Sequence, residues 1–219
     1  MEQEVLTSPF EISGLPPLSW LNDIAGDASV LSDQHGVQPS SLRMKTGAKT
    51  DWFNPPPDPS SPAGLANAPA LVFLAPEGDW QLSAKVSVEH NYLFDAATIF
   101  VHRDKDNWCK LCYEMSPERR PTIVSVVTRD ISDDANGAAV DGGTAHLRVS
   151  KYNSVFAFHY STDGGKYWTL HRAFCMRQAD TSSLSIGFMA QCPTGESCTA
   201  LFSDMQYSQT RLADLRDGS

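Results

Sequence analysis

The chain has 219 residues, 41% of them hydrophobic, which is enough for one sizeable core. Its 17 Lys and Arg against 26 Asp and Glu leave a formal charge of −9, which argues against nucleic acid and anionic membranes as partners, because both are bound through basic side chains. The longest apolar run, 70–75, is too short to span a membrane, and no apolar stretch follows the acidic N-terminus as in a secretory signal. We expect a cytoplasmic protein with one domain over residues 1–209 and a frayed C-terminal tail over 210–219.

The first expected elements are a short helical turn around 19–25 and a proline-rich loop at 54–62. Half of the prolines lie between Pro55 and Pro76, and proline cannot donate a hydrogen bond to a sheet. The loop is therefore expected to be extended, either as a plain connection between strands or as the rim of a binding cleft.

Strand periodicity dominates the rest of the chain. Residues 80–89 alternate apolar and polar side chains over ten positions, which is typical of an antiparallel strand with one buried face. Further β-rich segments are expected at 97–103, 107–115, 122–129, 145–150, 154–160, 166–172, 183–190 and 198–207. Short strands separated by Gly, Pro, Asn and Asp predict an all-β sandwich or barrel. A second helical turn is possible at 115–120.

The segment 107–114 is the most informative. On a strand, alternation places Cys109, Leu111 and Tyr113 on one face, which is expected to be core. The opposite face carries Trp108, Lys110, Cys112 and Glu114. An aromatic ring, a cation and a carboxylate on one face predict either a solvated face with a cross-strand ion pair or the floor of a groove that binds a ligand.

The five cysteines do not have the spacing of a disulfide framework or a metal site. Cys109 and Cys112 are three residues apart, so on a strand they point to opposite faces, and no second pair at zinc-site spacing completes four ligands. Free thiols are therefore expected, although the loop between Cys192 and Cys198 is short enough to be closed by a disulfide. We expect no metal and no cofactor.

Two polar segments have a structural interpretation. Residues 128–134 contain three aspartates without the spacing of a calcium loop, so we expect a solvated loop. Residues 161–168 fit the S-x-D-x-G-x-x-W signature of an Asp-box, in which the Asp bonds turn amides and the aromatic ring packs under a hairpin. His102 and His159 lie inside strand-like segments, and no nucleophile elbow, phosphate loop or zinc-protease motif is present.

Taken in order, these landmarks resemble the DUF1349 family. They are Thr50-Asp51-Trp52-Phe53, Gly78-Asp79-Trp80, the run 94–104 leading into 107–114, 125–128 with Ser132-Asp133, the 161–168 hairpin, Ile186-Gly187-Phe188 and 192–195. The resemblance implies a concanavalin A-like fold, an antiparallel jelly-roll β-sandwich, with a concave sheet face on which many relatives hold a sugar. The yeast member is named a regulator of enolase, which implies a metabolic enzyme as a possible partner.

The chain also departs from the family and from related glucanases. Cys109 and Cys112 replace aliphatic and glycine residues, and Asp134 stands where a tryptophan often follows Ser-Asp. These changes point to a ligand other than the family's usual one. The glucanase signature E-x-D-x-x-E begins at Glu77 but ends in Leu82, so glycosidase activity is not favoured.

The first functional hypothesis is a binding protein for a carbohydrate, a sugar phosphate or another polar metabolite. Trp108 would stack on the ligand, Lys110 would donate a hydrogen bond and Glu114 would accept one. The rim residues would be Asp51, Trp52 and Arg129.

The second hypothesis is a cofactor-independent isomerase or cyclase that acts on a small molecule in the same groove. Lys110, Glu114 and His102 are its candidate catalytic residues, with Arg129 as a further charged group. A third hypothesis is a protein-interaction module that uses the loop 54–62 or an exposed sheet edge, through which the chain could also form a homodimer.

Overall fold

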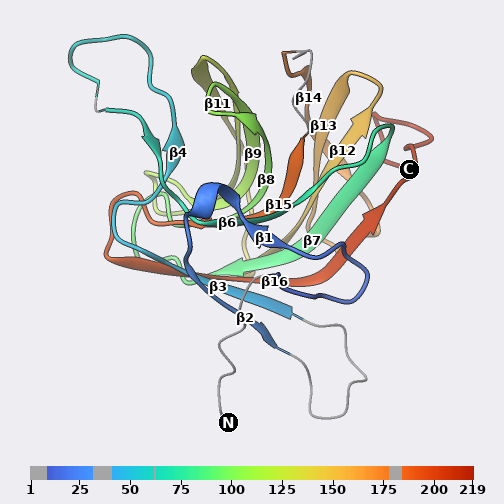
Figure 1. Ribbon diagram of the computed structural model, residues 1–219, viewed down its shortest axis with the longest axis horizontal. Coiled ribbons are helices and arrows are strands. Elements are labelled where there is room, and N and C mark those ends of the chain that lie inside the picture. The colour runs from blue at the N-terminus through green and yellow to red at the C-terminus, as the bar shows by residue number, and fades with distance from the viewer. Residues whose placement is uncertain (1–8, 32–40, 62, 178–183) are drawn as a thin grey trace.

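The computed structural model describes residues 9–31, 41–61, 63–177 and 184–219 (Figure 1). Two seven-stranded antiparallel sheets pack face to face, which confirms the antiparallel jelly-roll β-sandwich of the concanavalin A-like type. The expected helical turn is the 3₁₀ helix η1 (Leu21–Asp23), whereas residues 116–120 form a hairpin turn. No helix in the described residues is long and apolar enough to cross a membrane.

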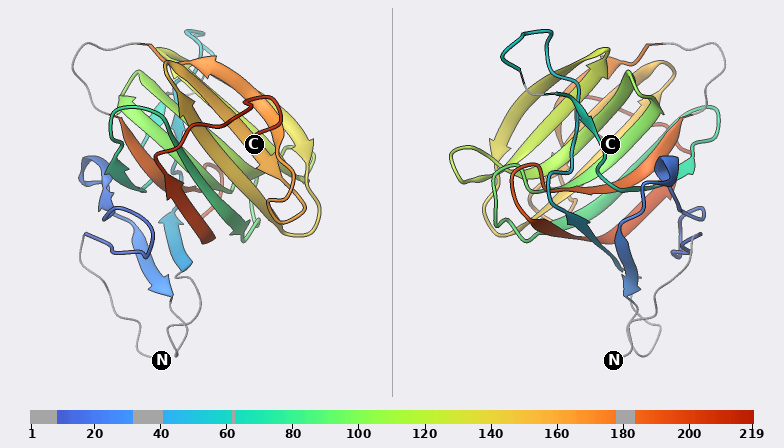
Figure 2. Two further views of the ribbon diagram at one scale, coloured as in Figure 1. Left: turned by 90° about the vertical axis from the view of Figure 1, so that its right-hand side faces the viewer. Right: turned by 60° about the vertical axis from the view of Figure 1, so that its left-hand side comes forward.

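The first sheet contains the strands on which the candidate site lies. Across the sheet, its strands are β1 (Ser19–Trp20), β6 (Ala70–Leu74), β15 (Ser185–Gln191), β8 (Ala96–Asp104), β9 (Asn107–Met115), β10 (Pro121–Arg129) and β11 (Ile131–Ala139). The second sheet forms the other layer of the sandwich (Figure 2). Its strands are β14 (Thr169–Cys175), β13 (Val155–Ser161), β12 (Thr144–Tyr152), β7 (Trp80–Val88), β16 (Ser197–Ser208), β3 (Ser41–Gly47) and β2 (Asp27–Leu31).

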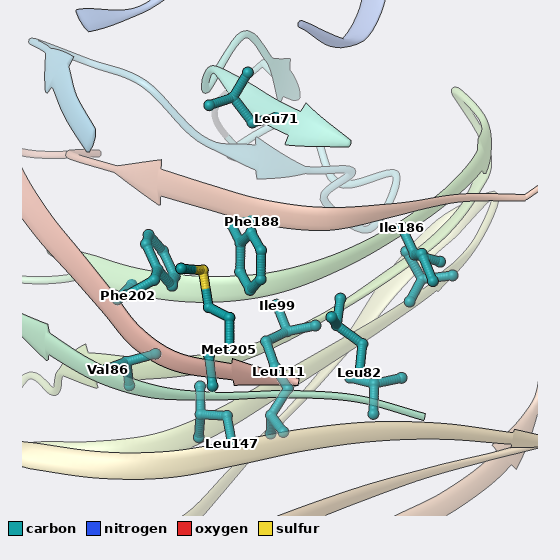
Figure 3. Close-up of a cluster of buried hydrophobic side chains, with 14 of the residues drawn as sticks. Leu71, Leu82, Val86, Ile99, Leu111, Leu147, Ile186, Phe188, Phe202 and Met205 are labelled. Atoms are coloured by element: carbon teal, nitrogen blue, oxygen red, sulfur yellow. The ribbon is translucent and has the colours of Figure 1, made fainter. Parts of the chain in front are cut away.

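The core lies between the two sheets and is formed by aliphatic and aromatic side chains from both layers (Figure 3). In β7 the even-numbered residues from Trp80 to Val86 are buried and the odd ones are half-buried, as the sequence alternation predicts. In β9, Cys109, Leu111 and Tyr113 point into the core, which confirms the predicted face. All of β9 from Asn107 to Glu114 is buried, however, so something also covers its other face.

That cover is the segment that connects β3 to β6. It contains β4 (Trp52–Phe53) and β5 (Leu65–Ala66), which pair into a small hairpin whose tip is the proline-rich loop. Figure 1 shows this hairpin standing beside β9 and β11. The proline-rich loop therefore lies at the tip of a hairpin. Pro62, in this loop, lies outside the described residues. So does residue 183, the first residue of the expected 183–190 strand.

Two further expectations from the sequence are wrong. Residues 131–139 form the edge strand β11 rather than a solvated loop, because β10 offers a free edge whose backbone groups they satisfy in pairs such as Val126–Asp134. The last residues are not frayed, since Leu212 is buried and the carbonyls of Leu215 and Gly218 accept hydrogen bonds from His159 and Arg148 of the second sheet.

The hairpin at 161–168 and the cysteines agree with expectation. Asp163 accepts hydrogen bonds from the Ser161 hydroxyl (2.7 Å) and the Tyr167 amide (3.1 Å), and Gly164 adopts a φ of 82° that favours glycine. All five cysteines are free thiols. Cys109 faces the core, whereas the Sγ of Cys112 lies on the opposite face, 3.4 Å from the Thr98 hydroxyl.

Candidate functional site

The outer face of the first sheet is divided into a dry cluster and a cavity. In the dry cluster, Trp52 from the covering segment packs edge to face against Trp108, with ring centroids 5.8 Å apart. Its ring is tilted against that of Phe100, at a centroid distance of 5.1 Å. Trp108 is 0% exposed, and its indole N–H donates to the carbonyl of Lys105. The covering segment therefore converts half of the predicted groove into a second small core.

The other half of this face is a cavity of about 410 Å³. This volume falls in the range of about 300–1,000 Å³ that is usual for small-molecule sites. The cavity is lined by Asp51, Phe53, Phe94, Lys110, Glu114, Pro117, Val124, Val126, Asp134, Asn136 and Gln191. Apolar walls thus surround a few convergent polar groups.

The floor of the cavity is one hydrogen-bonded row. Lys110 donates from Nζ to Asp51 Oδ1 (2.7 Å) and to Gln191 Oε1 (2.8 Å). Gln191 in turn donates from Nε2 to Glu114 Oε2 (3.2 Å) and to the carbonyl of Phe94 (3.1 Å). Gln191 therefore connects the cation to the acid without a direct ion pair between them.

Strand register explains why these side chains meet. Ala96 in β8 lies directly between Gln191 of β15 and Glu114 of β9. Because the alanine methyl is small, the two longer side chains reach each other above it. On the other side of β9, Lys110 pairs with Val126 of β10 and Val126 with Asp134 of β11, which brings the edge strand to the cavity wall.

Asp51 is held in place by its own turn. Its Oδ1 also accepts the Trp52 amide (2.7 Å), and its backbone N–H donates to the side chain of Asn67 (2.9 Å). Its carbonyl accepts the backbone N–H groups of Asn67 and Ala68. The carboxylate is thereby fixed against Lys110, whose side chain is only 2% exposed.

The environment sets unusual protonation states on this floor. Burial raises the pKa of Glu114 to about 8, against the opposing effect of Lys110, and the charges of Asp51 and Asp134 add to the rise. Burial acts to lower the pKa of Lys110, but Asp51 and its other negative neighbours more than offset this, so the net shift is upward. At neutral pH the floor therefore carries the Lys110 ammonium and an uncharged Glu114 carboxylic acid.

The structure brings together three of the residues predicted for the site, Lys110, Glu114 and Asp51. It places the others elsewhere. Trp52 and Trp108 are in the dry cluster, and Arg129 is exposed at the end of β10, 3.9 Å from Asp133. None of these three side chains lines the cavity.

The predicted catalytic residue His102 also lies outside the cavity. Its ring packs against Trp52 with centroids 5.2 Å apart, and burial lowers the pKa of His102 to about 4, so it is neutral at physiological pH. It lies on the same sheet face as Lys110 but behind the tryptophan cluster, so it is no acid or base for a ligand in the cavity.

Sequence reasoning does not place the rest of the lining in the site, although Asp134 stands out as a departure from the family. Gln191 is 1% exposed and lies at the end of a buried strand. A polar residue that continues a buried strand is the sequence signal that could have identified it as a site residue. Phe53 lies in the two-residue strand β4 and Phe94 in a turn, and both segments are too short for periodicity to assign a face. Asp134 and Asn136 depend on β11, whose polar sequence resembles a loop.

The lining offers hydrogen-bond donors, acceptors and aromatic rings rather than a metal site. Among the described residues, no group of three or more His, Cys, Asp or Glu side chains is arranged to hold a metal ion. The second oxygen of Glu114 has no hydrogen-bond partner in the described part of the chain, so it is available to a ligand in the cavity.

Several solved structures are similar in fold to this chain. A functionally unknown protein from Saccharomyces cerevisiae is similar with a TM-score of 0.72 and 22% identity over 89% of this chain and 97% of that chain. The GH43 protein BlXynB from Bacillus licheniformis is similar with a TM-score of 0.62 and 18% identity over 84% of this chain and 37% of that one.

A xylan beta-1,4-xylosidase from Bacillus halodurans C-125 has a TM-score of 0.59 and 9% identity over 76% of this chain and 32% of the xylosidase. The chain thus spans about a third of each Bacillus protein, and identities this low establish a shared fold alone. No curated protein sequence matches the chain. The family described as "Protein of unknown function (DUF1349)" matches residues 32–210, which is most of the chain. The chain therefore belongs to the DUF1349 family.

Proposed function

We propose that this protein binds a small, neutral, hydroxylated ligand of the carbohydrate class in the cavity above Lys110 and Glu114. The observation that carries the proposal is the Lys110–Gln191–Glu114 row, a built and largely buried polar floor beneath a cavity of about 410 Å³. Buried polar groups of this kind are costly to assemble, and they commonly fix the orientation of a ligand.

The charges on the floor favour a neutral ligand over a sugar phosphate. Lys110 is already compensated by Asp51, and Glu114 is uncharged at neutral pH because its pKa is raised to about 8 by burial. Asp134 adds a negative group to the wall. A phosphate would meet this carboxylate without a free cation to balance it, whereas hydroxyl groups can accept from the Glu114 acid and donate to Asp134.

The aromatic surface for the ligand is provided by Phe53 and Phe94, which replace Trp108 in the role of stacking residue. Both rings are half-buried and line the cavity. Apolar sugar faces pack on aromatic rings while the hydroxyl edges bond polar groups. The xylan-related name of one structural neighbour is compatible with this class of ligand, although that likeness rests on fold.

The test is isothermal titration of the purified protein with neutral mono- and disaccharides and with the phosphate esters of the same sugars. The proposal expects a neutral saccharide to bind and its phosphate to bind at least tenfold more weakly. Phe53→Ala should weaken binding tenfold or more, whereas Tyr167→Ala, which removes a 79% exposed aromatic ring from the 161–168 hairpin, should not change it. Absence of binding by every neutral saccharide, or tighter binding of the phosphates, would contradict the proposal.

A second candidate function is an enzyme of the isomerase or cyclase type in the same cavity. The specific observation in its favour is the Glu114 carboxyl, whose pKa of about 8 suits a general acid or base near neutral pH. Glu114→Gln keeps the shape and a hydrogen-bond donor but removes proton transfer. An enzyme would retain substrate binding in this variant and lose turnover, with a wild-type rate profile that changes near pH 8; a binding protein would show no turnover in either form.

A further inference from the structure

A second cavity, of about 660 Å³, lies on the outer face of the second sheet, on the opposite side of the sandwich from the first. Its floor is formed by outward-facing residues of β7, β12 and β16, and the 161–168 hairpin closes one end. Its lining includes Gln81, Ser83, His146, Arg148, Trp168 and Gln206. None of them belongs to the site described above.

Arg148 gives this cavity its chemistry. The residue is only 8% exposed, and its guanidinium lies against the ring of Trp168, 4.1 Å from the ring centroid. It donates from one terminal nitrogen to the carbonyl of Gly218. Its Nε–H is buried and has no hydrogen-bond partner, and no carboxylate of the described residues forms an ion pair with it.

A buried guanidinium without an anion is a costly arrangement, because burying a charge requires a partner of opposite sign. The neighbours of Arg148 do not supply one. In the register of the sheet it lies between Ser83 of β7 and His159 of β13, and neither is an anion. Burial lowers the pKa of Arg148 to about 10, which still leaves it charged at neutral pH.

Among the described residues that line the cavity, Asp204 is the acidic one, and its side chain is exposed. The other polar groups that line the cavity are the amide and hydroxyl side chains of Gln81, Ser83, Gln206, Tyr207 and Ser208 and the ring of His146. This surface contrasts with the first cavity, where the cation is fully compensated by Asp51.

We propose that this second cavity binds a small oxyanion-bearing ligand, whose carboxylate or phosphate oxygens accept hydrogen bonds from Arg148. Arginine presents a planar fork of N–H donors that matches both groups, and stacking on Trp168 fixes the plane of that fork. The serine and glutamine side chains around it bind the polar remainder of the ligand.

The experiment uses Ser83, which lies directly opposite Arg148 in the register of β7 and β12. Ser83→Glu places a carboxylate beside the guanidinium and takes the position of the ligand anion. Ser83→Gln is the matched control, because it adds the same length without the charge. Neither substitution alters Arg148 itself, so the comparison does not depend on whether an Arg148 variant folds.

Binding of acetate, gluconate and inorganic phosphate is measured by isothermal titration and by thermal unfolding, with chloride at equal ionic strength as the baseline. We expect at least one oxyanion to bind wild type and Ser83→Gln equally, and to bind Ser83→Glu at least tenfold more weakly. The ligand-free Ser83→Glu protein should also unfold at a higher temperature than Ser83→Gln. Gluconate and phosphate arms show whether carboxylate or phosphate is the preferred group.

Two results would overturn the proposal. One is that none of the three anions binds wild type more tightly than chloride. The other is that Ser83→Glu and Ser83→Gln bind the anion equally, which would place it away from Arg148. An Arg148→Lys variant adds a check, since it keeps the charge but loses the fork, and weaker binding is expected.

Discussion

Glu114 shows how position alone changes the chemistry of a side chain. The same carboxyl in an unfolded chain titrates near 4.5, whereas burial in the cavity floor raises its pKa to about 8. The folded state therefore binds the proton more tightly than the unfolded state. Its contribution to stability is complete below about pH 4.5 and is lost as the pH rises through 8.

The first prediction follows from this linkage. At about 1.4 kcal/mol per pKa unit, ionising Glu114 costs on the order of a few kcal/mol of unfolding free energy. Glu114→Gln, which cannot ionise, should be more stable than wild type at pH 9 and gain no such advantage at pH 5. Urea unfolding of both proteins from pH 5 to 9 measures the difference. If the free energies of unfolding of the two proteins changed in parallel with pH, the pKa of Glu114 would not be raised by folding.

Trp108 makes the complementary point, since its role here is packing. It is 0% exposed and packs against Trp52 and Phe100. Trp108→Ala should reduce the free energy of unfolding by about 3–5 kcal/mol, the usual cost of removing a large buried aromatic. Trp108→Phe should retain ligand affinity. Loss of affinity in a stably folded Trp108→Phe protein would instead show that this ring contacts the ligand.

At the level of elements, the cavity depends on how the β4–β5 hairpin is fastened to the first sheet. Asn54 donates from its side-chain amide to the carbonyls of Lys105 and Asp130, at 3.2 and 3.0 Å. Its backbone exchanges hydrogen bonds with Ser132, at the start of β11. Asn54 thus joins two parts of the cavity wall, the hairpin that carries Phe53 and the edge strand that carries Asp134.

Asn54→Ala is therefore expected to loosen the hairpin. The variant loses two side-chain hydrogen bonds, at about 1 kcal/mol each, and should show faster amide hydrogen exchange in β4 and the start of β11. Ligand affinity in the first cavity should fall with it. Asn91→Ala is a suitable control, because Asn91 is exposed and its side chain makes no hydrogen bond with the described residues. Equal exchange in the two variants would rule out the fastening role.

The sequence was sufficient for the strands with regular alternation and for the two faces of β9, because a period of two follows directly from strand geometry. It did not reveal what covers each face. Trp108 and Lys110 share a face, yet one is sealed under Trp52 and the other borders a cavity. That difference is made by a segment some fifty residues earlier, and local periodicity contains no information about it. β11 was missed because its side chains are polar and its strand character comes from pairing with β10.

At the level of the whole molecule, the sandwich has two chemically distinct outer faces. The first sheet carries a cavity with a compensated cation and a neutral acid, and the second sheet carries one with an uncompensated guanidinium. Because the hydrophobic core separates them, the two sites are expected to bind their ligands independently (Figures 2 and 3). Titrating a saccharide in the presence and absence of saturating oxyanion should give the same affinity.

Contacts with other proteins remain a proposal that is separate from both cavities. The projecting loop 54–61 and the sheet edges β2 and β14 are the surfaces such a partner, a metabolic enzyme or a second copy of the chain, would use. Shortening the loop between residues 55 and 61 should abolish a complex formed through it while leaving saccharide affinity unchanged. Sedimentation velocity, with and without a partner, measures the result.

The pairing of Trp52 with Trp108 under the β4–β5 hairpin gives the protein an internal optical reporter. Both indoles lie in a dry environment that exists only while the covering segment is closed over the sheet. Release of that segment would admit water to both rings at once and shift their emission to longer wavelength. The emission of Trp80, which lies in the main core, would not change. Opening and closing beside the first cavity can therefore be followed in the unlabelled protein by its own fluorescence.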